Sequence, residues 1–159
     1  MDEPRWLDSH EERVWRSMLV ILERLPSSID TQLKRDVGIT RFEYNVLSML
    51  SMSPDDTAPM SSLAFLTNGS MSRLSHAVTK LEERGWMRRS PSATDRRSLL
   101  ATLTPEGRRL LEQAAPAHVE QVRTSLFDAI PPERMRELGE LLEPVARALL
   151  GPGDPQLPD

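Results

Sequence analysis

The sequence predicts a mainly α-helical protein with one small β-hairpin, an α+β fold. Three observations lead to this prediction. Apolar residues recur at helical spacing along most of the chain, Ser or Thr followed three positions later by Glu marks helix starts, and one short stretch alternates as a strand does. With 159 residues, of which 38% are hydrophobic, the chain can form one domain, or one compact domain with an oligomerisation extension.

A long first helix is expected near the N-terminus. Ser9 and Glu12 form a possible capping box at its start. Pro26 is expected to kink or break this helix, because proline lacks an amide hydrogen and clashes with the preceding turn. Gly38 ends the segment. The apolar positions of the helix and its continuation are Val14, Trp15, Met18, Leu19, Leu22, Leu25, Ile29 and Leu33.

A second helix follows, with Thr40 and Glu43 as its capping box and apolar residues at Phe42, Val46, Leu47 and Leu50. The composition of residues 53–59, with two prolines and two aspartates, predicts a loop. A short helix over about 60–67 comes next.

Residues 70–84 predict an amphipathic helix that ends at Gly85. Ser70 can cap its start after the Asn68-Gly69 turn signal. One face is an apolar stripe of Met71, Leu74, Val78 and Leu81. The other face carries Ser72, Arg73, His76, Thr79, Lys80 and Glu83, short polar and basic groups that can reach base edges. Taken alone, the same pattern fits an ordinary solvated surface helix.

A hairpin is predicted immediately after this helix. Residues 86–90 and 98–103 flank a seven-residue tip, and Leu99, Ala101 and Leu103 alternate as in a half-buried strand. In the tip, Asp95 can hold the guanidinium of Arg97 extended, and a narrow minor groove attracts an extended arginine. A helix followed by a basic-tipped hairpin suits duplex DNA, with the helix in the major groove and the tip in the minor groove.

The last part of the chain is again helical. Thr104 is expected to cap a helix with Pro105 at its first position, running to about Phe127 with a bend at Pro116. Pro131-Pro132 starts a final helix with a kink at Pro144 and an end at Gly151. Its apolar residues are Leu138, Leu141, Leu142, Val145, Leu149 and Leu150. Residues 152–159 are predicted to be a disordered tail.

Charge is segregated along the chain. Residues 70–109 contain nine basic and four acidic residues, a net charge of +5. Because the whole chain carries −4, the remainder carries −9. A basic footprint on an acidic body is typical of a protein with one focused DNA-binding face.

Four motifs together resemble the MarR family of transcriptional regulators. They are Leu63-Ala64, Leu81-Glu82-x-x-Gly85-Trp86, Asp95-Arg96-Arg97 and Leu103-Thr104-Pro105-Glu106-Gly107. The resemblance extends more loosely from about Thr40 to Leu150. It implies a winged helix-turn-helix homodimer that binds a pseudo-palindromic operator and acts as a repressor. By this resemblance, residues 1–39 and 105–151 are dimerisation regions and residues 40–104 form the DNA-binding region.

The resemblance also assigns roles to residues. Ser72, Arg73, Ser75 and His76 are expected to meet base edges, with Arg73 the best candidate for a bidentate contact to guanine. Thr79 and Lys80 are expected at phosphates, and Ser61, Ser62 and Ser70 are expected to donate to backbone oxygens. In the wing, Arg97 would enter the minor groove, Asp95 would orient it and Arg96 would favour phosphate.

Many members of the family release DNA when a small aromatic or phenolic acid binds between the dimer helices and the DNA-binding lobe. The matching region here comprises Trp15, Met18, Leu19, Tyr44, Leu47 and Gln113. Arg13 and Arg16 could neutralise an anionic ligand. The alternative for each of these residues is a place in the core or, for the arginines, on the solvated surface. The stretch from Asp95 to about Val119 is similar to the urate-responsive branch, although Asn45 stands where that branch carries an acidic residue.

Other function classes are less well supported by the sequence. The chain has no cysteine, which excludes disulfides and thiolate metal sites. Its three histidines, His10, His76 and His118, are widely separated, and neither a metal-ligand spacing nor a glycine-rich phosphate loop is present, so no enzyme, metal or cofactor is expected. No membrane span or signal peptide is predicted, which favours the cytoplasm. A winged helix used for protein contacts stays open as an alternative, and a steep salt dependence of DNA binding would separate the two.

Overall fold

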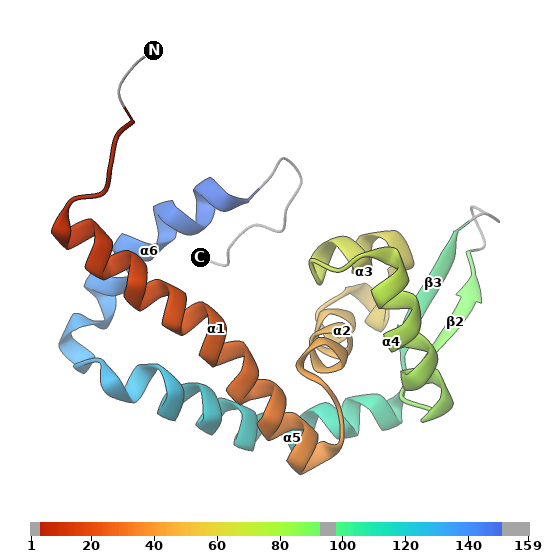
Figure 1. The fold of residues 1–159 in the computed structure, drawn as a ribbon. Helices are drawn as coiled ribbons and strands as arrows, with labels where there is room; N and C mark the ends of the chain where they lie inside the picture. Colours follow the sequence, from red (N-terminus) through yellow and green to blue (C-terminus); the bar gives the residue numbers. More distant parts are fainter. Residues whose placement is uncertain (1–3, 93–97, 151–159) are drawn as a thin grey trace.

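The computed structural model describes residues 4–92 and 98–150. Within these ranges, the structure consists of α-helices and a small antiparallel sheet, whose strands β2 and β3 lie at one edge of the molecule (Figure 1). The helices are α1 (Ser9–Val37), α2 (Arg41–Ser51), α3 (Met60–Leu66), α4 (Met71–Glu83), α5 (Pro105–Ser125) and α6 (Met135–Leu149), and the strands are β1 (Thr57–Pro59), β2 (Met87–Pro91) and β3 (Leu99–Leu103). Short 3-10 turns lie at Pro54–Asp56, Phe127–Ala129 and Pro132–Arg134. The predicted mainly helical fold with a hairpin is confirmed.

Most helix ends are where the sequence predicts them. The Thr40 hydroxyl accepts from the Glu43 amide at 3.1 Å, and the Ser70 hydroxyl accepts from the Arg73 amide at 3.2 Å. Gly38 and Gly85 adopt the left-handed conformation expected of helix ends, with φ of +71° and +73°. The Ser9–Glu12 box is wrong by one residue, because Asp8 is the N-cap and its side chain accepts from the amide of Glu11 at 2.9 Å.

The prolines inside the helices do not divide them. Helix α1 continues through Pro26, α5 through Pro116 and α6 through Pro144. Of the kink or break expected at Pro26, the break is wrong, because α1 is continuous from Ser9 to Val37. Helix α5 ends at Ser125, slightly before the predicted end.

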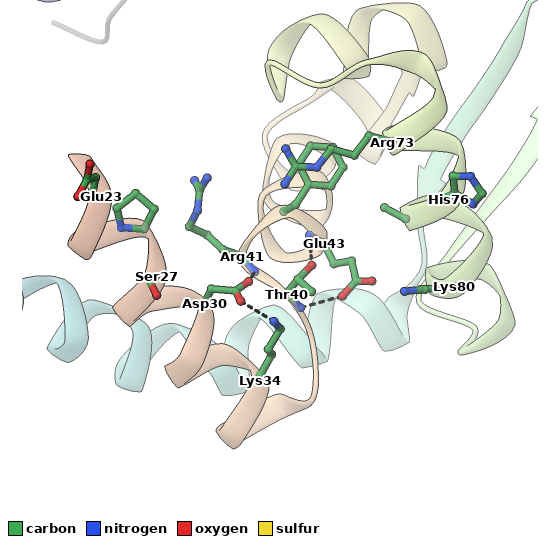
Figure 2. A pocket seen from close by; sticks show the side chains of 13 residues that line it. Glu23, Ser27, Asp30, Lys34, Thr40, Arg41, Glu43, Arg73, His76 and Lys80 are labelled. Carbon is green, nitrogen blue, oxygen red and sulfur yellow. Dashed lines mark hydrogen bonds and ion pairs between the residues drawn. The ribbon is translucent and has the colours of Figure 1, made fainter. Parts of the chain in front are cut away.

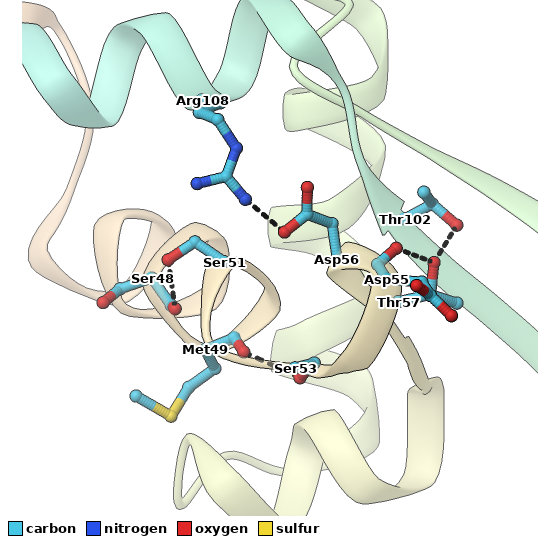
Figure 3. Close-up of polar contacts among 9 residues, drawn as sticks. All are labelled: Ser48, Met49, Ser51, Ser53, Asp55, Asp56, Thr57, Thr102 and Arg108. Carbon is cyan, nitrogen blue, oxygen red and sulfur yellow. Dashed lines mark hydrogen bonds and ion pairs between the residues drawn. The ribbon is translucent and has the colours of Figure 1, made fainter.

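The sheet contains a third strand that the sequence does not reveal. Residues 57–59, expected as loop, pair with β3 in the order β1-β3-β2, with Thr57 opposite Thr102. The two threonine hydroxyls lie 3.0 Å apart, and Asp56 forms an ion pair with Arg108 of α5 (Figure 3). Three residues are too short to show a strand period, so only the pairing with β3 identifies this strand.

The core lies between α2, α3, α4, the sheet and the start of α5. Leu74, Val78 and Leu81 of α4 are buried in it, whereas Met71 is 52% exposed. Ala77 takes the fourth buried position of α4, so the predicted stripe is right except at Met71. The fully buried large side chains are Leu33, Ile39, Val46, Leu47, Leu50, Leu63, Leu74, Val78, Leu81 and Met87.

The Thr-Pro-Glu-Gly junction has a packing reason for its glycine. Gly107 lies against the turn that follows α4, so that a Cβ at this position would be 2.0 Å from the carbonyl oxygen of Trp86. The Thr104 hydroxyl caps α5 at the Gly107 amide and also donates to the carbonyl of Gly85. This junction therefore fixes the start of α5 against the turn that ends α4.

Helices α1 and α6 contribute little to this core. Along α1 only Gln32 and Leu33 are buried, and no residue of α6 is. In Figure 1 α6 lies at the opposite end of the molecule from β2 and β3. Among the described residues, no helix has the length and apolarity needed to cross a bilayer. The predicted tail lies outside the described residues, as does Gly151.

Candidate nucleic-acid interface

The polar face of α4 is exposed, as a helix that binds a partner requires. Its caps and buried stripe orient the helix so that this face points away from the core. The structure places seven of the predicted site residues on this exposed surface: Ser70, Ser72, Arg73, Ser75, His76, Thr79 and Lys80.

Arg73 is held by a contact that the sequence does not reveal. Its guanidinium lies over the ring of Phe42 in α2, 4.1 Å from the ring centroid. The same ring fills the space beside Gly69, where a Cβ would be 2.7 Å from Phe42 Cζ. Phe42 therefore packs against both Gly69, in the turn before α4, and the guanidinium of Arg73. The predicted guanine-binding group is orientated before any partner arrives.

A second contact ties α4 to the root of the hairpin. The Arg89 amide donates to Glu82 Oε1 at 2.6 Å, and Arg89 Nε donates to Oε2 at 2.8 Å. Burial alone would raise the pKa of Glu82, but the hydrogen bonds from Arg89 outweigh it and hold that pKa below its ordinary value. Arg89 also donates to the hydroxyl of Thr79 at 3.3 Å, so Thr79 is already engaged within the protein.

The end of α4 is tied to the junction between α1 and α2. Arg84 donates to the carbonyl oxygen of Gly38 at 2.9 Å, and its guanidinium lies 5.0 Å from the ring centroid of Trp86. Four of the basic residues counted in the +5 segment contact other groups of the chain. Arg84 donates to a carbonyl oxygen, whereas Arg89, Arg108 and Arg109 form ion pairs with carboxylates. Part of the positive charge of residues 70–109 therefore belongs to arginines that bond within the chain.

The hairpin tip cannot be compared with its prediction. Asp95, Arg96 and Arg97 lie outside the described residues. Its two strands are present within one residue of the expected ranges, and the amide of Ser92 donates to the carbonyl of Ser98 at 2.9 Å. The wing is therefore anchored where the sequence placed it.

A groove of about 600 Å³ lies between α1, the start of α2 and α4. Figure 2 shows Arg41 rising from the start of α2 and Arg73 reaching toward it from α4, while the ring of His76 points to the other side of α4. Lys34 Nζ lies 2.6 Å from Asp30 Oδ2. The other carboxylate oxygen, Asp30 Oδ1, accepts a hydrogen bond from the backbone amide of Arg41 at 2.8 Å. The hydrogen bond from Lys34 lowers the pKa of Asp30, burial opposes this shift, and the Arg41 amide adds to it.

Ser61 and Ser62, the expected backbone contacts, are exposed in the first turn of α3. Nothing else in the structure distinguishes them. They lie in the helix that precedes α4, the arrangement of a helix-turn-helix.

The expected ligand residues are not gathered in one environment. Leu47 is fully buried in the core, Trp15 is 50% exposed on α1, and Gln113 is exposed on α5. Met18 and Tyr44 are half-buried, and Leu19 is exposed. The Tyr44 ring lies 4.6 Å from that of His118, a neighbour that sequence spacing does not suggest. Burial raises the pKa of Tyr44 and lowers that of His118.

No group of three or more histidine or acidic side chains suited to a metal ion occurs among residues 4–92 and 98–150. The polar groups of the interface are instead hydroxyls, one imidazole and cations on a convex helix. This set suits hydrogen bonding to base edges and phosphates.

Comparison with known proteins gives one consistent result. The model of the MarR family matches residues 39–99. The HTH-type transcriptional regulator PecS of Dickeya dadantii is 31% identical over 155 residues, which cover 92% of this chain and 87% of PecS. Among solved structures, the MarR family regulator Sco3205 of Streptomyces coelicolor, crystallised in complex with DNA, is 41% identical, with a TM-score of 0.87 over 97% of this chain and 96% of that one.

A more distant structure shares the fold. BpsR of Bordetella bronchiseptica, whose DNA binding is regulated by 6-hydroxynicotinic acid, is 21% identical, with a TM-score of 0.72 over 84% of this chain and 98% of that one.

Proposed function

The chain belongs to the MarR family of transcriptional regulators, and we propose that it represses transcription by binding a pseudo-palindromic operator as a homodimer. The observation that carries this proposal is the likeness, over nearly the whole chain, to a regulator whose structure contains DNA. The exposed polar face of α4 supplies the chemistry for such a contact. Regulators of this family act on chromosomal DNA, so the proposed location is the cytoplasm, and no catalytic role is proposed.

Base recognition is assigned to the first half of α4. Arg73, whose guanidinium lies over Phe42, would donate two of its N–H groups to guanine O6 and N7. Ser72, Ser75 and His76 would contact neighbouring base edges. Lys80 would bind phosphate. The Thr79 hydroxyl would bind phosphate either while it accepts from Arg89 or after that hydrogen bond is broken.

The remaining contacts are assigned to the wing and to helix starts. Arg97, orientated by Asp95, would enter the minor groove, and Arg96 would bind phosphate. Ser61, Ser62 and Ser70 would donate to phosphate oxygens. The wing tip would thus add contacts in the minor groove to the base contacts of α4 in the major groove.

Dimerisation is supported by apolar surface that the single chain leaves exposed. On α6, Leu141 is 63% exposed and Val145 52%, and on α1 Val14 is 64% exposed. Exposed apolar side chains that recur along a helix face indicate a surface for a partner. A closed two-fold dimer would bury both helices and set the spacing of two α4 helices at about one turn of DNA, roughly 34 Å.

Release by a small acid is proposed as the regulatory step. The regulation of BpsR by 6-hydroxynicotinic acid supports this class of effector. The half-buried pair of Tyr44 and His118, beside the junction of α2 and α5, offers an aromatic surface within the region expected for the ligand. Binding of candidate aromatic acids can be measured by isothermal titration calorimetry, and His118→Ala should weaken the binding if the acid lies against this pair.

The proposal is tested by selecting duplexes from a random library with the full-length protein. We expect an inverted repeat with half-sites about 10 base pairs apart. Arg73→Ala should relax the selection at one position of each half-site, a discrimination of about 1–3 kcal/mol. Arg97→Ala should weaken operator binding while circular dichroism stays unchanged. Selection of no common sequence, or binding that is indifferent to salt, would contradict sequence-specific DNA recognition.

A further inference from the structure

We propose that Arg41 binds a phosphate of the DNA strand that passes α4 on the side away from the wing. This inference rests on the proposed function and adds to it a contact outside the helix-turn-helix and the wing. It concerns the groove between α1, the start of α2 and α4.

The dimensions of DNA place a strand at this groove. The major groove is about 12 Å wide, and an α-helix with its side chains is about 10–12 Å across. A helix inserted there has one sugar-phosphate strand along each flank. Strand β2 is joined to α4 by Glu82 and Arg89 on one flank, whereas the groove containing Arg41 opens beside Arg73 and Lys80. The strand on this second flank therefore has to pass the junction of α1 and α2.

Arg41 is fixed relative to α4 although its side chain is exposed. Its amide donates to Asp30 at 2.8 Å, and Asp30 is itself held by Lys34 at 2.6 Å. At the other end of the same junction, Arg84 donates to the carbonyl of Gly38 at 2.9 Å. These contacts anchor the backbone and leave the guanidinium of Arg41 pointing into the groove (Figure 2). Binding of a phosphate would therefore lose little conformational entropy, because the backbone at Arg41 is already fixed.

The charges of the groove suit a phosphate near Arg41. The acidic side chains Asp30 and Glu43 are both engaged by backbone amides, those of Arg41 and Thr40. Within the described part of the chain, Arg41, Arg73 and Lys80 form no ion pair with a carboxylate. Glu23 lies at the far side, on α1. Three cations thus face the space along which the strand would run.

The test compares Arg41→Gln with Arg24→Gln. Both variants remove one exposed positive charge, but Arg24 is not among the residues that line this groove. Dissociation constants of the full-length proteins are measured at several NaCl concentrations, for a selected operator and for a scrambled duplex. Circular dichroism and size-exclusion chromatography confirm that fold and assembly are unchanged.

A phosphate contact predicts a specific result. Arg41→Gln should weaken the operator and the scrambled duplex by similar factors, about 3–10-fold near 150 mM salt, and lower the salt slope by about 0.9 for each Arg41 that touches phosphate. Arg41→Lys should retain most of the affinity. Arg24→Gln should retain both the affinity and the slope of the wild type.

Several outcomes would overturn the inference. Equal slopes for Arg41→Gln and the wild type would do so, as would a loss confined to the operator, which indicates a base contact instead. Binding of inorganic phosphate to the DNA-free protein that depends on Arg41, with an unchanged DNA slope, would assign the groove to a small anion. A wild type that bound no duplex would overturn the proposed function as well, whereas an unaffected Arg41→Gln overturns this inference alone.

Discussion

Helices α4 and α6 are both amphipathic, but they differ in how far their apolar sides are buried. Three of the four buried residues of α4 belong to its apolar stripe, and on the polar side Arg73 lies over Phe42 and Glu82 accepts from Arg89. Arg84, just after the helix, donates to the carbonyl of Gly38. Helix α6 has no buried residue, and Leu141 is 63% exposed. The same sequence pattern therefore describes one helix whose apolar side is buried by its own chain and another whose apolar side that chain leaves exposed. Under the proposed function, the exposed face of α4 binds DNA and the exposed stripe of α6 forms the dimer interface.

The largest effect is expected from charging the exposed stripe of α6. In Leu141→Glu combined with Val145→Glu, the carboxylates would have to be buried in the proposed dimer, so dimer should give way to monomer in size-exclusion chromatography with light scattering. Operator affinity should fall by about 10²–10⁴-fold because the two half-sites are no longer bound together. Helical circular dichroism should stay unchanged.

Glu140→Gln, on the same helix, provides the control. This residue is exposed and is not part of the apolar stripe. An unchanged dimer in the double variant would mean that α6 does not form the dimer interface, and the comparison with α4 would have to be revised.

The buried stripe of α4 is tested by Leu74→Ala. Leu74 has no exposed surface, so the truncation leaves a cavity and should lower the free energy of unfolding by about 2–5 kcal/mol in urea titrations. Leu141→Ala, measured at a protein concentration low enough to give monomer, should change it by less than about 0.5 kcal/mol. Equal losses in the two variants would show that α6 also packs within its own chain.

The smallest effect concerns Glu82 on the other side of α4. Because the pKa of Glu82 is lower in the folded protein than its ordinary value of 4.5, its stabilising effect is complete above that pH and is lost as the pH falls through the folded pKa. Glu82→Gln should therefore lower stability at neutral pH by about 1 kcal/mol and by progressively less in acid. Thermal unfolding between pH 7 and pH 3 measures this dependence.

The neighbouring variant Glu83→Gln separates the local contact from a general charge effect. Glu83 is exposed, and its substitution should leave the acid dependence of stability unchanged. If both variants behaved alike, the bond between Glu82 and Arg89 would not be what holds α4 to the hairpin.

Local rules placed much of the fold correctly. The caps at Thr40, Ser70 and Thr104 and the glycine ends at Gly38 and Gly85 involve groups within a few residues of each other, so the sequence is sufficient to find them. The Ser9–Glu12 box failed because Asp8 and Glu11 offer the same spacing one residue earlier. The roles of individual residues at DNA or ligand stay predictions.

The order of the helices, the hairpin and the polar face of α4 could be predicted from residue patterns, because spacing and capping act over one or two helical turns. Which apolar stripes are covered depends on how the helices pack in three dimensions. The tertiary structure also paired Thr57 with Thr102, set Arg73 over Phe42 and brought Arg41 to the groove beside α4. These contacts join residues that are 31 to 45 positions apart or lie on different elements, and no local periodicity encodes them. Whether a side chain is buried depends on what the rest of the chain places against it.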